Sequence, residues 1–176
     1  MSADLPNVAV RTIYRPDRYL RGGDHISFLQ QGYPAVRFTE PHENFAHQHQ
    51  DVRVVNGVQF GDLPQFVDFE FNARVAKVNG AALWTMAQAP GTPKNVFIDT
   101  TQLTNNSTLR WDADPNVDGG YEIVWRESDQ PQWSRVIPVG KVNTVTVNLS
   151  KDNVQLGVRA VGKNGFKSPA AFPFPG

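Results

Sequence analysis

Apolar residues recur at helical spacing in the first half of this chain and at alternating positions in the second half. The longest helical pattern covers residues 64–86, where one apolar stripe is formed by Val67, Phe71, Val75, Val78 and Ala82. This spacing predicts a long helix, with Pro64 in its first turn and Asp62 as a candidate cap just before it.

Shorter patterns upstream of this helix predict a mixture of helix and strand. Residues 8–13 form a candidate strand, and residues 34–38 are a short apolar run suited to a buried strand. Between them, residues 24–31 can form a helix, with Asp24 as N-cap and Gly32 ending it. Residues 1–88 are therefore predicted to be α/β, although two strands can cover the stripe of the long helix only partly.

Beyond a predicted linker at residues 89–93, apolar and polar residues alternate. The alternating sets are Val96 and Ile98 with Leu109 and Trp111; Tyr121, Ile123 and Trp125; Val145, Val147 and Leu149; and Val154, Leu156, Val158 and Ala160. Turn signals separate the sets at residues 118–120, 139–141 and 164–165. Short alternating strands with regular turns predict an all-β sandwich over residues 94–176.

This second half resembles a fibronectin type III domain. The resemblance is carried by Trp111, by the strand at residues 121–126, by Leu149 with residues 154–161, and by the ending at residues 164–169. The tyrosine usual in that family is replaced by Val154, which removes one stabilising hydrogen bond. Trp111 and Trp125 are expected in the core. Trp133 lies in a polar stretch and is the candidate for an exposed contact with a polymer, a cell wall or another domain.

Composition narrows the classes of function. The 176 residues include 17 basic and 17 acidic ones, and this balance favours neither nucleic acid nor an anionic membrane as partner. The apolar runs are too short for membrane insertion, and no signal peptide opens the chain. Cysteine is absent, which excludes disulfides and thiolate zinc sites. Any zinc must therefore be bound by histidine and carboxylate side chains.

All four histidines lie between residues 25 and 49, so this segment is where metal or acid–base chemistry is expected. His47 and His49 are two residues apart and would share one face of an extended backbone. Together with Glu43 or Asp51 they could form a mononuclear zinc site. The alternative is a solvated loop that binds no metal. His25, beside Asp24 at a helix start, also has a purely structural interpretation.

Three ordered blocks resemble the C-terminal part of the di-zinc aminopeptidases, exopeptidases of the leucyl-aminopeptidase type that are related to glutamate carboxypeptidase. The blocks are residues 22–28, 32–36 and 47–51, within a resemblance that covers about residues 13–86. It implies that His47 is the last zinc ligand, that Asp51 orients the loop, and that Asp24 and His25 frame the substrate pocket. The role of His49 stays open.

The same resemblance shows what is missing. The family's early His-x-Asp, bridging Asp, Glu-Glu pair and further acidic ligand have no counterpart here. Ala46 stands where some members carry a carbonyl-stabilising tyrosine, for which Tyr19 or Tyr33 could substitute. One histidine cannot hold two zinc ions, so at most a partial zinc site is expected, and no catalytic residue is assigned.

The sequence thus predicts two domains: residues 1–88 as the C-terminal part of an αβα zinc-exopeptidase domain, and residues 94–176 as a fibronectin type III-like sandwich. The expected function is release of N-terminal residues from peptides, inactive in this chain alone. An upstream peptidase segment or another chain would complete the sheet. The resemblance implies a secreted or periplasmic location. A non-catalytic binding protein that uses the sandwich is the alternative.

Overall fold

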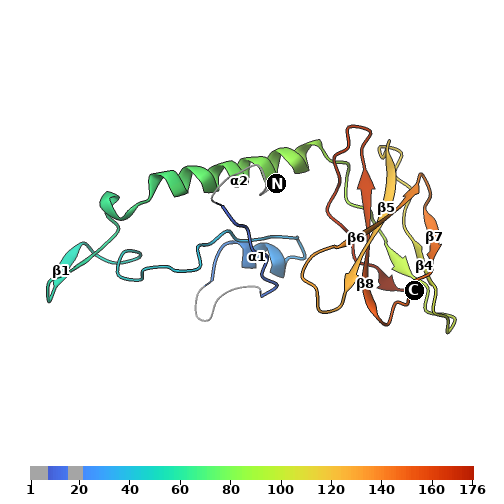
Figure 1. The fold of residues 1–176 in the computed structure, drawn as a ribbon, viewed down its shortest axis with the longest axis horizontal. Helices are drawn as coiled ribbons and strands as arrows, with labels where there is room; N and C mark the ends of the chain where they lie inside the picture. The colour runs from blue at the N-terminus through green and yellow to red at the C-terminus, as the bar shows by residue number, and fades with distance from the viewer. Residues whose placement is uncertain (1–7, 16–21) are drawn as a thin grey trace. The chain divides into compact units, whose positions relative to one another are not determined.

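The computed structural model describes residues 8–15 and 22–176, which fall into two compact units (Figure 1). One unit is Ile13–Ala76; the other is Lys77–Gly176 together with the stretch up to Thr12. The boundary falls inside a long helix, and the two units are described separately below.

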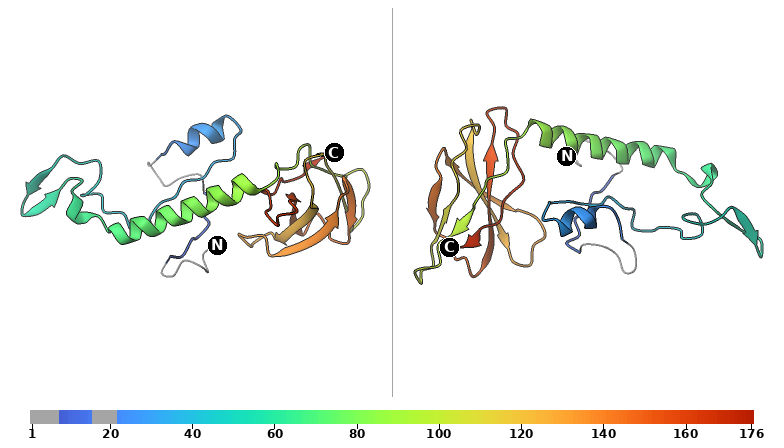
Figure 2. Two further views of the ribbon diagram at one scale, coloured as in Figure 1. Left: turned by 90° about the horizontal axis from the view of Figure 1, so that it is seen from above. Right: turned by 180° about the vertical axis from the view of Figure 1, so that it is seen from behind.

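The larger unit contains a β-sandwich of two sheets (Figures 1 and 2). One sheet has the order β7-β4-β3-β9, with β3 at Phe97–Ile98, β4 at Ser107–Arg110, β7 at Thr144–Val147 and β9 at Phe174–Pro175. The other has the order β6-β5-β8, with β5 at Gly120–Glu127, β6 at Arg135–Gly140 and β8 at Val154–Val161. Isolated bridges from Val158 to Ala171 and from Val161 to Lys167 extend this sheet beyond β8. The predicted β-sandwich is confirmed.

The core lies between the two sheets and is built from the alternating positions. Its buried members include Val96, Ile98, Leu109, Trp111, Tyr121, Ile123, Leu156, Val158 and Ala160, and Trp125 packs against them. Trp111 and Tyr121 form a tilted aromatic pair with ring centroids 5.3 Å apart. The expected core positions of Trp111 and Trp125 are confirmed. Alternation therefore identified the inward face of these strands correctly.

The chain ends in the first sheet. β9 pairs with β3 in parallel, so that Phe97 is opposite Phe174 and Ile98 is opposite Pro175. The Phe174 N–H donates to the Val96 carbonyl (2.9 Å), and the Gly176 N–H donates to the Ile98 carbonyl (3.0 Å). All other strand pairs of the sandwich are antiparallel.

Trp133, which the sequence predicted to be available for an exposed contact, packs on the outer face of the three-stranded sheet. A Cβ atom added at Gly157 would lie 3.1 Å from Trp133 Cη2 and 3.2 Å from Val124 Cγ2. Val124 is fully buried although it faces outward. The Phe172 ring lies 5.1 Å from the Trp133 ring, and the Arg126 guanidinium lies 5.5 Å from it. Trp133 is thus half-buried in a small outer cluster of its own domain.

The first half of the chain forms elements that differ from those its pattern predicted. They are α1 (His25–Gln30), the hairpin β1 (Arg53–Val55) and β2 (Val58–Phe60), the 3₁₀ turn η2 (Pro64–Phe66) and α2 (Phe69–Gln88). The helix at α1 is confirmed, but the Asp24 side chain makes no capping hydrogen bond. The strands predicted at residues 8–13 and 34–38 are wrong, because no described strand pairs with either segment.

The long helix starts later than its apolar stripe suggested. Pro64 opens η2, which ends at Phe66, and α2 follows from Phe69. The Phe71 N–H donates to the Asp68 carboxylate (2.8 Å), so Asp68 caps this helix and Asp62 does not. The chain conformation between Pro64 and Asp68 therefore sets where α2 begins.

Most apolar side chains of this half are exposed. In α2 only Val78 is buried among the described residues, and Leu83 and Trp84 are 66% and 64% exposed. Other exposed members are Phe28, Tyr33, Val36, Phe38, Phe45, Val54, Val55, Val58, Phe66, Phe69 and Phe71. A stable domain buries such residues, so this half carries a large exposed apolar surface in the described residues. In the described residues, no helix has the length and hydropathy needed to cross a bilayer.

Candidate functional site

The loop that carries His47 is fixed by backbone hydrogen bonds. The His47 N–H donates to the Asn44 carbonyl (3.0 Å), and the Ala46 N–H donates to the Asn44 side-chain oxygen (3.0 Å). The Gly61 N–H, just after the β1–β2 hairpin, donates to the Ala46 carbonyl (2.9 Å). Gly61 has φ +109°, and a Cβ there would lie 2.7 Å from Val52 Cα. Only glycine fits this junction, which joins the histidine loop to the hairpin.

The His47 imidazole lies flat against the ring of Phe66. The ring centroids are 3.6 Å apart and the ring planes differ by 6°. The side chain is half-buried, and neither ring nitrogen makes a hydrogen bond within the described residues. Stacking occupies one face of an imidazole and leaves the in-plane nitrogen lone pair available. The geometry therefore suits His47 as a single metal donor.

His47 and His49 do not form the expected pair on an extended backbone. His49 has φ +51°, in the left-handed region, and its side chain is exposed, as is that of His42. Within residues 8–15 and 22–176, no three His, Asp or Glu side chains come together as a group that could hold a metal ion. The described residues thus fit one zinc donor but not a complete site.

Asp51 follows this loop, and its backbone is tied to Arg53. The Arg53 guanidinium donates to the Asp51 carbonyl (3.1 Å) and to the Gln50 side-chain oxygen (3.0 Å). The same guanidinium lies 4.5 Å from the centre of the Phe60 ring. The Asp51 side chain is exposed. Its predicted role in orienting the loop stays a prediction.

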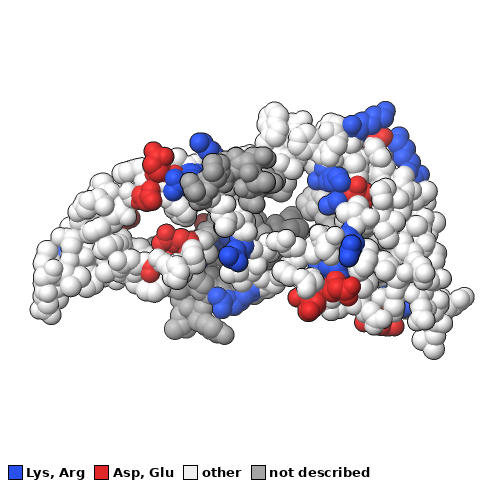
Figure 3. All heavy atoms as spheres, viewed as in Figure 1, with Lys and Arg blue, Asp and Glu red and all other residues white. Residues whose placement is uncertain are grey.

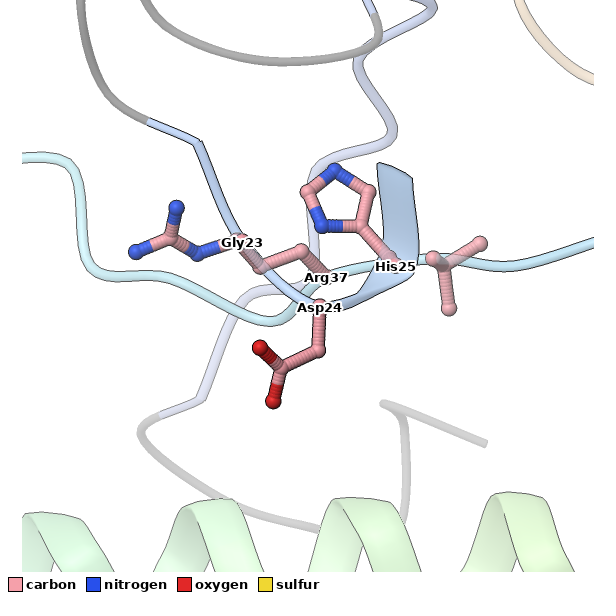
Figure 4. Close-up of a pocket in the computed structure, with 5 residues that line it drawn as sticks. Gly23, Asp24, His25 and Arg37 are labelled. Carbon is pink, nitrogen blue, oxygen red and sulfur yellow. The ribbon is translucent and has the colours of Figure 1, made fainter. Parts of the chain in front are cut away.

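Asp24 and His25 line a small open hollow of about 350 Å³ together with Gly23, Val36 and Arg37 (Figure 4). The Asp24 carboxylate and the His25 imidazole point to opposite sides of the backbone (Figure 4). Arg37 donates to the Gly22 carbonyl (2.6 Å), and a Cβ at Gly23 would lie 3.0 Å from His25 Nδ1. Both residues thus border one open hollow, and their predicted role in a substrate pocket stays a prediction.

Two contributors to these sites were not found from the sequence, namely Phe66 and Arg37. Neither belongs to a motif, and only the folded chain brings each beside a predicted residue. Tyr33 is 64% exposed, and Tyr19 lies outside the described residues. On the face shown in Figure 3, acidic and basic side chains are scattered in small groups of both signs.

Nearly the whole of this chain, including the histidine loop, is similar to part of longer proteins. The chain is 60% identical over 168 residues to a probable zinc metalloprotease of Pyrenophora tritici-repentis, covering 95% of this chain and 35% of that protein. It is 56% identical over 171 residues to one from Leptosphaeria maculans, covering 97% and 39%. It is 53% identical over 176 residues to one from Pyricularia oryzae, covering 97% and 35%.

Proteins named as probable zinc metalloproteases thus match nearly the whole of this chain. The chain spans little more than a third of the length of these relatives. No protein-family model matches it.

The solved structures that match cover about half of this chain. A fibronectin-III-like protein from Clostridium thermocellum is 19% identical and covers 51% of this chain and 94% of its own, with a TM-score of 0.41. The FN5 domain of Drosophila Lar is 22% identical and covers 50% and 99%, with a TM-score of 0.36. The sandwich fold rests on its own strand order and register, described above.

Proposed function

We propose that this chain is one part of a zinc-dependent aminopeptidase, in which His47 supplies one zinc ligand. The observation that carries the proposal is the match at 51–60% identity to proteins named probable zinc metalloproteases, which extends across the histidine segment. The ring nitrogens of His47, which make no hydrogen bond within the described residues, support it. The aminopeptidase class comes from the three motif blocks at residues 22–28, 32–36 and 47–51.

The residues of this chain would bind and position rather than catalyse. His47 would donate one nitrogen, Asp51 would hold the loop, and Asp24 and His25 would line the pocket for the substrate's N-terminal residue. Zinc, when bound, supplies Lewis-acid polarisation of the scissile carbonyl. Because the described residues bring no three ligands together, the remaining ligands must come from elsewhere, and this chain alone is expected to be inactive.

The exposed apolar surface supports the same proposal. Apolar side chains of α2 such as Leu83 and Trp84, and the valines of the β1–β2 hairpin, are exposed in the described residues, and a two-stranded hairpin is marginally stable alone. The occupant we propose is the peptidase segment that makes up the rest of the relatives' length. Packed there, α2 would form an outer layer of an αβα domain.

The test is to complete this chain with the remaining residues of the Pyrenophora tritici-repentis relative, then assay peptide hydrolysis and zinc content. We expect the completed protein to bind zinc and cleave peptides with a free N-terminus but not N-acetylated ones. His47→Ala should remove zinc and activity, whereas His49→Ala, two residues away, should retain both. Cleavage of the acetylated peptides, or unchanged zinc in His47→Ala, would overturn the proposal.

A further inference from the structure

The contact between Phe66 and His47 joins two segments that are 19 positions apart in the chain. Phe66 is the last residue of η2, and His47 lies in the loop before the β1–β2 hairpin. Centroids 3.6 Å apart with planes within 6° describe full face-to-face overlap. Aromatic pairs usually prefer offset or edge-to-face arrangements. Because the Phe66 ring covers one face of the imidazole, a turn of the imidazole out of this plane would break the contact. The contact therefore favours one orientation of the imidazole plane.

Metal-binding histidines usually have their ring orientation fixed through the second nitrogen, which donates to a carboxylate or carbonyl. His47 has no such hydrogen bond within the described residues. Hydrogen bonds from the His47 N–H to the Asn44 carbonyl and from the Gly61 N–H to the Ala46 carbonyl fix the backbone of this loop. The His47 ring can therefore change its orientation only through its side-chain torsions. Stacking on Phe66 restricts those torsions without using either nitrogen.

We infer that Phe66 is a positioning residue, which presents the His47 imidazole to zinc in a fixed plane. This inference rests on the proposed function. Residues that orient metal ligands typically change metal affinity about 10–100-fold when replaced. A stacking contact without a hydrogen bond belongs at the lower end, so loss of the Phe66 ring should weaken zinc binding about tenfold.

The experiment compares Phe66→Leu and Phe66→Tyr with Phe69→Leu as the matched control. Phe69 is the first residue of α2 and is 66% exposed, so the control makes the same chemical change nearby without touching His47. Zinc affinity is measured by chelator competition in the protein completed with the relative's remaining residues, and the Co²⁺-substituted absorption spectrum reports ligand geometry. In this chain without metal, NMR measures the ring-proton shifts of His47.

We expect Phe66→Leu to weaken zinc binding about tenfold, alter the Co²⁺ spectrum and move the His47 ring protons downfield as the ring current is lost. Phe66→Tyr should restore all three, and Phe69→Leu should change none. If His47→Ala removes zinc but Phe66→Leu leaves affinity and spectrum unchanged, the positioning role is overturned while the proposed function stands. If His47→Ala also leaves zinc unchanged, the proposed function itself fails.

Discussion

Glu122 is the acidic centre of a charge cluster on the outer face of the three-stranded sheet, and its neutralisation gives a quantitative test of the fold. Its carboxylate accepts from Arg159 (2.7 Å) and from Lys167 (3.0 Å), and its side chain is only 11% exposed. Burial alone would raise the pKa of Glu122, but the hydrogen bonds and charges of Lys167 and Arg159 outweigh burial and hold that pKa below its ordinary value of 4.5.

The expected size follows from the exposure of each partner. Hydrogen bonds to charged groups contribute about 1.5–3 kcal/mol, a range that suits the Arg159 contact. The more exposed Lys167 contact belongs with surface pairs worth about 0.2–1 kcal/mol. Glu122→Gln keeps the side-chain shape but removes the charge, so we expect a loss of about 2 kcal/mol in the free energy of unfolding at pH 7. For a domain of this size, that lowers Tm by about 10 °C.

The pH dependence has a definite sign. Because the folded pKa lies below the unfolded one, the stability contributed by Glu122 is present above about pH 4.5 and is lost as pH falls through the folded pKa. The difference between wild type and Glu122→Gln should therefore shrink below pH 4.5. Urea unfolding followed by tryptophan fluorescence, to which the buried Trp111 contributes, measures this difference.

Glu127→Gln is the matched control, because Glu127 lies on the same strand, is exposed and has no ion pair within the described residues. It should change stability little at any pH. A neutral effect of Glu122→Gln at pH 7, or a deficit that persists undiminished into acid, would refute the reasoning.

Three further outcomes are expected from single changes. Leu109→Ala removes a fully buried core side chain and should cost about 2–5 kcal/mol in urea unfolding; a loss below 1 kcal/mol would contradict the described core. Asp68→Ala removes the cap of α2 and should lower helix stability by about 1 kcal/mol, with a matching loss of far-ultraviolet ellipticity that Asp62→Ala does not cause. Gly61→Ala forces a side chain against the Val52 backbone, so it should abolish amide-exchange protection in the hairpin. In the control Gly57→Ala the added carbon meets no atom within 4 Å, so this change should cost only the strain of the positive φ. Equal effects of the two changes would contradict the tight junction at Gly61.

The sequence predicted the sandwich well because its core residues alternate with polar ones, a local signal. Two strands of the sandwich, β6 and β9, were not predicted. β6 contains Pro138 and is mostly exposed, and β9 contains Pro175, so both lack the alternation and carry a residue that disfavours strands. As outer strands of their sheets they tolerate proline, but only the sheet order reveals that position.

The first half was predicted less well, because most of its large apolar side chains are exposed in the described chain and so do not build a core. The run at residues 34–38 is apolar enough for a strand, but a strand needs a neighbour to pair with. His47 was identified through its motif, whereas the separation of His49 depends on one left-handed backbone angle. The contact with Phe66 joins the histidine loop to the 3₁₀ turn η2, and no local pattern encodes it.

The parallel pairing of β9 with β3 also determines how the sandwich would respond to mechanical tension. A load between residue 93 and Gly176 slides these strands along each other, because the start of one and the end of the other lie at opposite ends of a parallel pair. Their hydrogen bonds then share the force and rupture together, whereas a load across an antiparallel hairpin opens them one after another. In single-molecule pulling, a load applied at residue 93 and Gly176 should give a higher rupture force than a load applied at Glu127 and Arg135, the ends of β5 and β6 beside their connecting loop. Equal rupture forces would show that the β3–β9 pair carries no load.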